Sequence, residues 1–269
     1  MAQQYIVVSW NCQRATADSH VWDYLLELDP VVALLQEVGV VAPKVLDRFT
    51  SVQQPATRKT GAPQKFSTAL LVRGQIGAPI RLTGLSDWVD AKLEKFAGNL
   101  ICRELFPSDG PPLKAISVYS PAWPIDPKRL ADVDVSGMKL THNPGLWLAD
   151  ILWASLKYQR PSSTDRWIVA GDFNLSETFD QTTWSAGGNR EYLDRMSVLG
   201  FTECLRESKG SLTPTFRNTH GGAIKHQMDH MFVTQALASR LVSCDTGSQE
   251  RVFGSGLSDH LPLVAHFRL

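Results

Sequence analysis

Acidic, amide and histidine side chains stand at or near the ends of apolar, strand-like segments of this chain. The set comprises Asn11, Glu37, Asp172, Asn174, Asp229, Asp259 and His260. A polar group at the tip of a strand is held rigidly at a place where a pocket can form. Each residue alone is ordinary, since a glutamate after a strand is usually solvated and Gly-Asp-Phe-Asn is a turn-forming tetrapeptide. The set as a whole predicts an active site built from separate strand ends.

These residue types suit one kind of chemistry, the metal-assisted cleavage of a phosphate ester. Carboxylate and amide oxygens are hard ligands that favour Mg²⁺ or Mn²⁺ over Zn²⁺. A hard divalent ion neutralises charge on a phosphate and on its leaving oxygen. A histidine held by a carboxylate acts as a general acid or base, or stabilises charge on the phosphorane. The sequence therefore predicts a phosphoesterase that uses Mg²⁺ or Mn²⁺.

The elements that must position these residues are mostly strands. Apolar runs, several rich in β-branched residues and bounded by Gly, Pro, Asp or Asn, are typical of strands in the middle of a sheet. The expected strands are Tyr5–Trp10, Val31–Gln36, Ser67–Val72, Leu100–Phe106, Leu113–Tyr119, Trp167–Ala170, Met228–Val233 and Leu261–Phe267. Their order along the chain is not a strict strand–helix alternation. This favours two packed sheets flanked by helices over a doubly wound sheet.

Helices are expected in three places. Asp18–Asp29 carries an apolar face, with Asp18 or Ser19 as its N-cap and Pro30 as its stop. Asn143-Pro144 offers a cap and a first helical position to a second helix. A third helix starts near Asn189. No repeat or long linker divides the chain, so we expect a single domain over residues 1–269.

Five short motifs resemble, in order, those of the exonuclease–endonuclease–phosphatase superfamily. They are Ser9-Trp10-Asn11, Leu35-Gln36-Glu37, Gly171-Asp172-Phe173-Asn174, Met228-Asp229-His230 and Ser258-Asp259-His260-Leu261-Pro262. Pancreatic-type deoxyribonucleases, abasic-site endonucleases, inositol polyphosphate phosphatases, neutral sphingomyelinases and deadenylases belong to this superfamily. The resemblance runs from the first expected strand to the last. It implies an α/β fold of the α+β type, a four-layer α/β/β/α sandwich of two mixed β-sheets flanked by helices.

The resemblance also implies a role for each motif residue. Glu37 would be the main metal ligand, with Asn11 and Asp259 close by. Asp172 would align or deprotonate the attacking water, and Asn174 would hold a phosphate oxygen.

The remaining roles concern the scissile phosphate. His260 would contact it, and Asp229 would orient and polarise the histidine ring. Tyr119 matches a strand-end position that often carries a phosphate-contacting tyrosine or histidine.

Two departures narrow the resemblance. Gln13 stands where many abasic-site enzymes carry an acidic residue, which argues against that activity. Pro121-Ala122-Trp123 precedes Gly171, whereas the inositol phosphatases carry a similar signature after it.

Substrate specificity in this superfamily depends on loops around the shared site. Basic and aromatic loop residues suit phosphate contacts and base stacking, and Arg14, Arg217, Trp123 and Trp184 are the candidates. The leading hypothesis is a nuclease, endo- or exonucleolytic. The alternatives are a phosphoesterase for a small soluble ester or a lipid headgroup, and a non-catalytic binding module. The complete set of polar strand-end residues argues against the last.

Composition indicates which partners and which compartment to expect. Lys plus Arg and Asp plus Glu number 27 each, so no net charge draws the chain to nucleic acid or membrane. The four cysteines form no C-x-x-C pair, which argues against a zinc ribbon and indicates reduced thiols. Neither a signal peptide nor a membrane span is evident. We therefore expect a cytoplasmic protein with no membrane association and no obligate protein partner.

Overall fold

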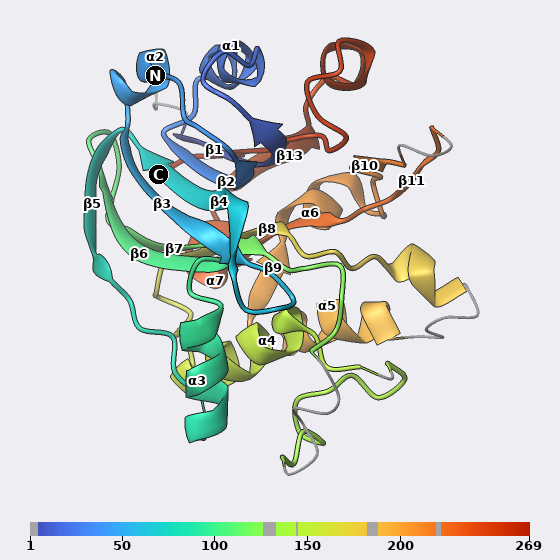
Figure 1. Cartoon of the computed structure of the whole chain (residues 1–269). Coiled ribbons are helices and arrows are strands. Elements are labelled where there is room, and N and C mark those ends of the chain that lie inside the picture. Colours follow the sequence, from blue (N-terminus) through green and yellow to red (C-terminus); the bar gives the residue numbers. More distant parts are fainter. Residues whose placement is uncertain (1–4, 85, 126–132, 144, 182–187, 219–221) are drawn as a thin grey trace.

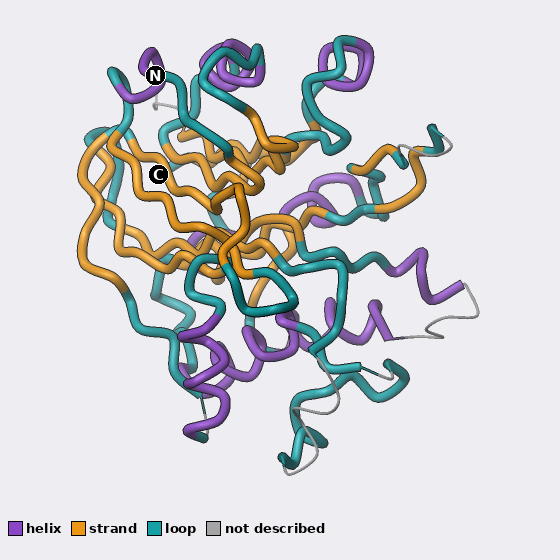
Figure 2. The backbone as a smooth tube through the Cα atoms, in the orientation of Figure 1, coloured by secondary structure: helices purple, strands orange, loops and turns teal. Residues whose placement is uncertain are grey.

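Two six-stranded β-sheets lie face to face in the computed structural model, between two layers of helices (Figures 1 and 2). The structure describes residues 5–84, 86–125, 133–143, 145–181, 188–218 and 222–269. Both described ends of the chain lie on the same side of the sandwich. The predicted α+β fold with two mixed sheets is thereby confirmed.

The first sheet has the strand order β13-β14-β1-β2-β4-β3. Its strands are β1 (Tyr5–Ala15), β2 (Val32–Val38), β3 (Thr50–Thr57), β4 (Pro63–Val72), β13 (Leu241–Thr246) and β14 (Leu263–Phe267). Among these described strands, β1 and β2 are the parallel pair, and every other neighbouring pair is antiparallel.

The second sheet has the order β5-β6-β7-β8-β12-β9. Its strands are β5 (Gly74–Pro79), β6 (Leu100–Pro107), β7 (Leu113–Tyr119), β8 (Trp167–Asp172), β9 (Phe201–Glu203) and β12 (Asp229–Thr234). Here β7 and β8 are parallel, and the other described pairs are antiparallel. A separate short hairpin joins β10 (Phe216–Arg217) to β11 (Ile224–His226).

The helices cover the outer faces of the sandwich. The first sheet is covered by α1 (Val21–Glu27), α2 (Pro43–Leu46) and a π-helical turn, η3 (Glu250–Gly254). The second sheet is covered by α3 (Asp87–Lys95), α4 (Leu148–Gln159) and α5 (Gly188–Val198). The short elements α6 (Cys204–Lys209), α7 (Gln235–Ala238) and η2 (Glu177–Gln181) complete the described set.

The central strands are apolar throughout because both of their faces are buried. Side chains alternate between the two faces of a strand. In β1, Val7 packs between the sheets while Val8 packs against the helical layer. In β8, Ile168 packs between the sheets and Val169 against the other helical layer. Three apolar layers therefore hold the sandwich together and keep the strand ends at fixed positions.

Several predicted boundaries are wrong. β1 continues past Trp10 to Ala15, so Asn11 lies inside the strand. α1 begins at Val21 after His20, without a side-chain cap. Ser19 Oγ instead accepts a hydrogen bond from the backbone of Thr16.

The predicted start of the second helix is also wrong. α4 begins at Leu148, because Asn143 Oδ1 accepts hydrogen bonds from Gly145 N and the Trp147 indole and so stabilises a turn. Pro144 lies outside the described residues. The third predicted helix, near Asn189, is confirmed as α5.

Some strands were not expected from the sequence. They are β3, β5, β9, β10, β11 and β13. β3, β5, β9 and β13 lie at sheet edges, so polar residues along them reach solvent and hide the apolar pattern that marks a central strand. The four cysteines are buried free thiols, as predicted. Within the described residues, no helix combines the length and apolar character needed to cross a bilayer.

Candidate active site

The two parallel strand pairs bring the predicted site residues together. Parallel strands run in the same direction, so their carboxyl ends meet at one edge of the sheet. β1 and β2 place Asn11 and Glu37 at that edge of the first sheet, and β7 and β8 place Tyr119 beside Asp172 in the second. Asn11 Nδ2 donates to Asp172 Oδ2 at 3.1 Å, which joins the two sheets at this point.

The backbone is unusual at this edge. Gln13, Arg14, Glu37 and Asn174 all have positive φ values, between 46° and 62°. Non-glycine residues adopt this left-handed region rarely, and such strain is concentrated at functional sites. The pairing of β1 with β2 also shifts register after Asn11, and such a bulge re-aims side chains. The sequence therefore folds here in a way that turns Glu37 and its neighbours toward the site.

Asp172 is a buried carboxylate held by amides. Its Oδ1 accepts a hydrogen bond from Asn174 N at 2.9 Å, and its Oδ2 accepts one from Asn174 Nδ2 at 3.1 Å. Burial raises the pKa of Asp172 to about 7, with Asp229 adding to the rise and His260 opposing it. A carboxylate with a raised pKa takes up a proton more readily than an exposed one, which suits a general base.

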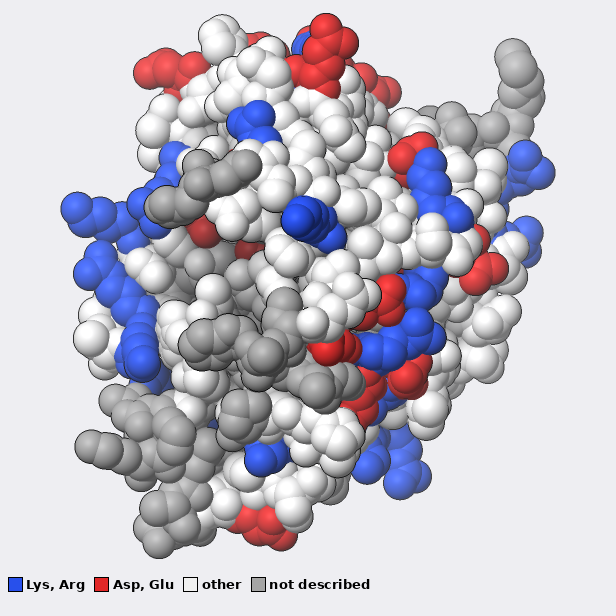
Figure 3. Space-filling view, turned by 90° about the vertical axis from the view of Figure 1, so that its right-hand side faces the viewer, with Lys and Arg blue, Asp and Glu red and all other residues white. Residues whose placement is uncertain are grey.

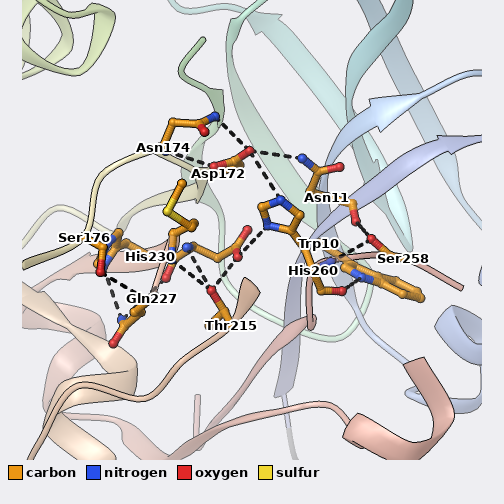
Figure 4. Close-up of polar contacts among 12 residues, drawn as sticks. Trp10, Asn11, Asp172, Asn174, Ser176, Thr215, Gln227, His230, Ser258 and His260 are labelled. Carbon is orange, nitrogen blue, oxygen red and sulfur yellow. Dashed lines mark hydrogen bonds and ion pairs between the residues drawn. The ribbon is translucent and has the colours of Figure 1, made fainter. Parts of the chain in front are cut away.

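His260 is held by a second buried carboxylate. Its Nδ1 donates to Asp229 Oδ2 at 2.9 Å, and the same oxygen accepts a hydrogen bond from Thr215 Oγ1 at 2.6 Å. Its Nε2 lies 4.0 Å from Asp172 Oδ2 (Figure 4). Burial alone would lower the pKa of His260, but the carboxylates of Asp229 and Asp172 outweigh it and raise the pKa to about 10.

The backbone of His260 is fixed as well as its ring. Trp10 Nε1 donates to the carbonyl of His260 at 2.8 Å, and His260 N donates to Ser258 Oγ at 3.1 Å. Ser258 Oγ in turn donates to the carbonyl of Asn11 at 2.7 Å. The loop before β14 is therefore tied to the first sheet, and the ring is aimed at Asp172 of the second (Figure 4).

Glu37 occupies the more open part of the site. Its side chain is 18% exposed, and burial followed by the charge of Asp259 raises its pKa, against the opposing effect of Arg14 and His260. Asn11 lies close enough to oppose this rise, and the Tyr119 hydroxyl lies beside the same carboxylate. Burial and the carboxylate of Glu37 both raise the pKa of Tyr119, so its hydroxyl stays protonated and serves as a donor.

Among the described residues, two clusters at this edge could hold a divalent ion. Ligand atoms of Asp172, Asp229 and His260 lie within 4.8 Å of one another. In that cluster, however, the histidine is already paired with Asp229. The second cluster is Glu37 with Asn11 and the half-buried Asp259, which offers oxygen ligands alone. Oxygen donors suit Mg²⁺ or Mn²⁺, so the second cluster fits such an ion better.

Of the predicted substrate-binding residues that the structure describes, Arg14 alone is mostly exposed beside the site, and the others pack against neighbouring residues. The Arg14 guanidinium is mostly exposed, lies 3.6 Å from Glu37 and covers the ring of Phe66. The Arg217 guanidinium instead donates to the carbonyl of Phe253 and stacks on its ring. Trp123 is half-buried against Phe96 in the helical layer. Trp184 lies outside the described residues.

Two residues of the site were missed by sequence reasoning. Thr215 bonds Asp229, and the ring of Phe216 lies 4.9 Å from the ring of His260. Thr215 directly precedes β10, and Phe216 is its first residue. No pattern in the sequence marks a threonine or phenylalanine as part of a site. Backbone hydrogen bonds from Thr215 N to His226 and from Leu261 N to Thr215 hold this segment in place.

The family now follows from comparison with known sequences. The profile of the endonuclease/exonuclease/phosphatase family matches residues 8–260. The chain belongs to this family. No curated protein sequence matches this family member.

Solved structures with the same fold cover almost the whole chain. An AP endonuclease from Archaeoglobus fulgidus aligns with a TM-score of 0.72 and 19% identity, over 98% of this chain and 100% of its own. An AP endonuclease from Leishmania major aligns with a TM-score of 0.66 and 15% identity, over 99% and 88%. The 3′ phosphatase NExo from Neisseria, bound to product DNA hairpin, aligns with a TM-score of 0.65 and 15% identity, over 98% and 100%. At these identities the likeness concerns the fold.

Proposed function

We propose that this family member is a Mg²⁺- or Mn²⁺-dependent phosphodiesterase that hydrolyses nucleic acid, as an endo- or exonuclease. The observation that carries the proposal is the meeting of two unlike groups at one edge of the sandwich. One is the buried His260–Asp229 pair, which faces Asp172 at 4.0 Å. The other is the oxygen cluster around Glu37. A proton-handling pair beside a hard-ion cluster suits in-line attack of water on a phosphodiester.

The roles proposed for the buried residues follow from their contacts. Asp172 accepts the proton of the attacking water, because its carboxylate is raised in pKa and held in place by two amides. His260, kept cationic by Asp229, stabilises charge that develops on the phosphate oxygens. Asn174 positions Asp172, and its amide would reach a phosphate oxygen by releasing one of its two bonds, to the Ser120 carbonyl or to Asp172 Oδ2.

The roles proposed at the open side concern binding. Glu37, Asn11 and Asp259 would hold the metal ion. A bound Mg²⁺ or Mn²⁺ would neutralise charge on the phosphate and its leaving oxygen. Tyr119 donates its hydroxyl toward this side, and Arg14 presents an exposed guanidinium that suits a phosphate of the substrate.

The choice of nucleic acid as substrate has two supports. Solved structures of the same fold include AP endonucleases and a 3′ phosphatase bound to product DNA. Arg14 beside the open half could also bind a second phosphate along a strand.

An activity screen with Mg²⁺ and Mn²⁺ tests the proposal. The panel holds single- and double-stranded DNA, RNA, abasic-site DNA, inositol phosphates and a simple phosphodiester, with Asp172→Ala protein as the control for contaminating nuclease. We expect cleavage of at least one polymer, abolished by EDTA and absent in the variant. Full activity in excess EDTA, or identical activity of the variant, contradicts the proposal.

A phosphoesterase for a small soluble ester is the second candidate. It is favoured by the zero net charge and by the intermixed positive and negative side chains on the right-hand part of the face that Figure 3 shows, although Lys and Arg gather along the left-hand edge of that face. Binding of a polyanion weakens steeply with salt. A flat salt dependence of KM, together with turnover of a small ester and of no polymer, would replace the first candidate with the second.

A further inference from the structure

A cavity of about 530 Å³ opens beside the proposed catalytic residues. Its described walls are largely aromatic and apolar, with a few polar groups among them, as is usual for a site that binds a small organic group. The residues used below are Trp147, Asp150, Asn174, Phe179, Tyr192 and His226. They come from α4, α5, β11, η2 and the segments before α4 and after β8.

The cavity adjoins the active site at Asn174. This residue lines the cavity, and its Nδ2 also donates to Asp172 Oδ2. A substrate phosphate held at Asn174 would thus place the next chemical group of the substrate at the mouth of the cavity. The proposed mechanism assigns no role to the cavity itself.

The floor of the cavity carries polar groups whose hydrogen-bonding capacity is not used. Asp150 is 1% exposed, and its Oδ2 accepts a hydrogen bond from Trp147 N at 2.8 Å. No residue in the described part of the chain donates to its Oδ1. The Tyr192 hydroxyl is fully buried and likewise has no partner among the described residues. A buried polar group without a partner costs stability, so the Tyr192 hydroxyl calls for an explanation.

Electrostatics shows what kind of group would satisfy this floor. The described lining contains an aspartate but no lysine or arginine. Burial raises the pKa of Asp150 to about 7, and burial together with the charge of Asp150 raises the pKa of Tyr192. An ionised Asp150 would repel a second negative charge, which disfavours a phosphate in this part of the cavity. A neutral group that donates N–H bonds would be accepted.

The shape and surface of the walls point to a flat ring. Phe179 and His226 lie with their ring centroids 4.5 Å apart on one wall, and Tyr192 and Trp147 also contribute to the lining. Aromatic side chains bind nucleobases by stacking on their π-faces. A nucleobase offers such a face together with N–H groups at its edge.

We propose that this cavity binds the nucleobase of the nucleotide that adjoins the scissile phosphate, with Asp150 and Tyr192 recognising its N–H edge. The assignment rests on the proposed nucleic-acid function. It adds that the base must be unpaired, since its Watson–Crick edge would be turned into the protein. Bases with an exocyclic amino group are preferred over thymine, because they present more donors to Asp150.

Calorimetric titration with single nucleotides tests the binding directly. The ligands are dAMP, dCMP, dGMP and dTMP, with deoxyribose 5-phosphate as the ligand that lacks a base. We expect at least one amino-bearing nucleotide to bind about 10-fold or more tightly than the sugar phosphate, given that stacking alone contributes about 1–3 kcal/mol. Equal affinity for the nucleotides and the sugar phosphate would overturn the proposal.

Two conservative variants separate recognition from folding. Tyr192→Phe removes a hydroxyl that has no partner, and Asp150→Asn removes the charge while keeping an oxygen that can accept from Trp147 N. Each variant should weaken nucleotide binding by about 5- to 10-fold, the range of one hydrogen bond to such a group. Asp194→Asn, a change of the same kind at an exposed position of α5, should leave binding unchanged. If Tyr192→Phe and Asp150→Asn bind like the wild type, the cavity has no such role.

Cleavage assays distinguish failure of this proposal from failure of the proposed function. If nucleotides bind as described but no nucleic acid is cleaved, the nuclease proposal fails and the base-binding cavity stands. If nucleic acid is cleaved, removing the base next to the scissile phosphate should raise KM, and Tyr192→Phe should raise KM only for the substrate that has the base. Cleavage that is indifferent to both changes sinks the cavity proposal and leaves the nuclease proposal intact.

Discussion

The two halves of the site differ in how completely their carboxylates are enclosed. Glu37, at the end of β2, has a side chain that is 18% exposed and a backbone in the left-handed region. Asp172 and Asp229, in β8 and β12, have side chains that are 2% and 1% exposed, and each accepts hydrogen bonds from at least two side chains. One sheet therefore presents an open carboxylate, and the other presents closed ones.

The difference corresponds to two kinds of chemical task. A carboxylate that binds an exchangeable ion needs oxygen lone pairs that the protein leaves accessible. A carboxylate that handles protons or orients a histidine needs a buried environment with fixed donors, since burial and neighbouring charges set its pKa. On this basis we propose that the half at β1 and β2 binds the ion and that the half at β8 and β12 transfers the proton.

The closed half of the site, with Asp172 and Asp229, should lose the most activity when one oxygen of a carboxylate is replaced. Asp172→Asn keeps the shape of the side chain but removes the proton acceptor, so kcat should fall by about 10³- to 10⁴-fold, near the upper range for general-base catalysis. The measurement is single-turnover cleavage at saturating Mg²⁺, together with a direct titration of the ion. Mg²⁺ affinity should change far less than kcat. An equal loss of both would place Asp172 in the ion site and erase the proposed division.

The open half should show the reverse pattern. Glu37→Gln should weaken Mg²⁺ or Mn²⁺ binding by more than about 100-fold, since loss of a residue that merely supports a ligand already costs about 10- to 100-fold. Isothermal titration with Mn²⁺ measures this without any substrate. Glu27→Gln, at an exposed position of α1, is the matched control. Unchanged ion affinity in Glu37→Gln would move the ion site to the second sheet.

Thr215 tests whether the closed half depends on its supporting contacts. Thr215→Val keeps the volume of the side chain but removes the hydroxyl that donates to Asp229 Oδ2. The rate should fall by about 10- to 100-fold, the range expected for one hydrogen bond to a charged group. Because Asp229 acts through His260, the pH profile of kcat should shift as well. A lower rate with an unchanged pH profile would indicate a role in stability alone.

Asp150 is a buried carboxylate that lies outside the proposed catalytic set, so its replacement should leave the chemical step unchanged. Its folded pKa of about 7 lies above the ordinary value of 3.8, so burial costs nothing below pH 4 and costs stability as the pH rises through 7. Asp150→Asn should therefore match the wild type at pH 4 and be more stable at pH 8. The gain should be a few kcal/mol, since one pKa unit corresponds to about 1.4 kcal/mol.

Urea unfolding at the two pH values measures this difference. Equal stability of wild type and variant at pH 8 would show that Asp150 is ionised without cost. Its carboxylate would then have a donor or cation beside it in the unliganded protein, and the argument for an unused acceptor in the cavity would be lost.

The sequence alone was sufficient to find the strands with two buried faces and the polar residues at their ends. The reason is local, because apolar runs that end in Asp, Asn or Glu mark both the strand and its tip. Edge strands such as β3 and β5 were missed, since solvent on one side permits polar residues along them. The capping role predicted for Asn143 was wrong for a different reason. An asparagine side chain can cap a helix or stabilise a turn, and here it accepts a hydrogen bond from Gly145 N and stabilises a turn.

Residue type and order determined the fold family, the candidate catalytic set and the kind of ion that suits it. The tertiary structure alone decided which of these residues meet. It joined Asn11 to Asp172 across two sheets, brought Thr215 to Asp229, and turned Arg217 to Phe253. It also formed the cavity at Asp150 and Tyr192 from segments far apart in the chain. Such contacts depend on how the strands and helices pack, and packing leaves no periodic pattern in the sequence.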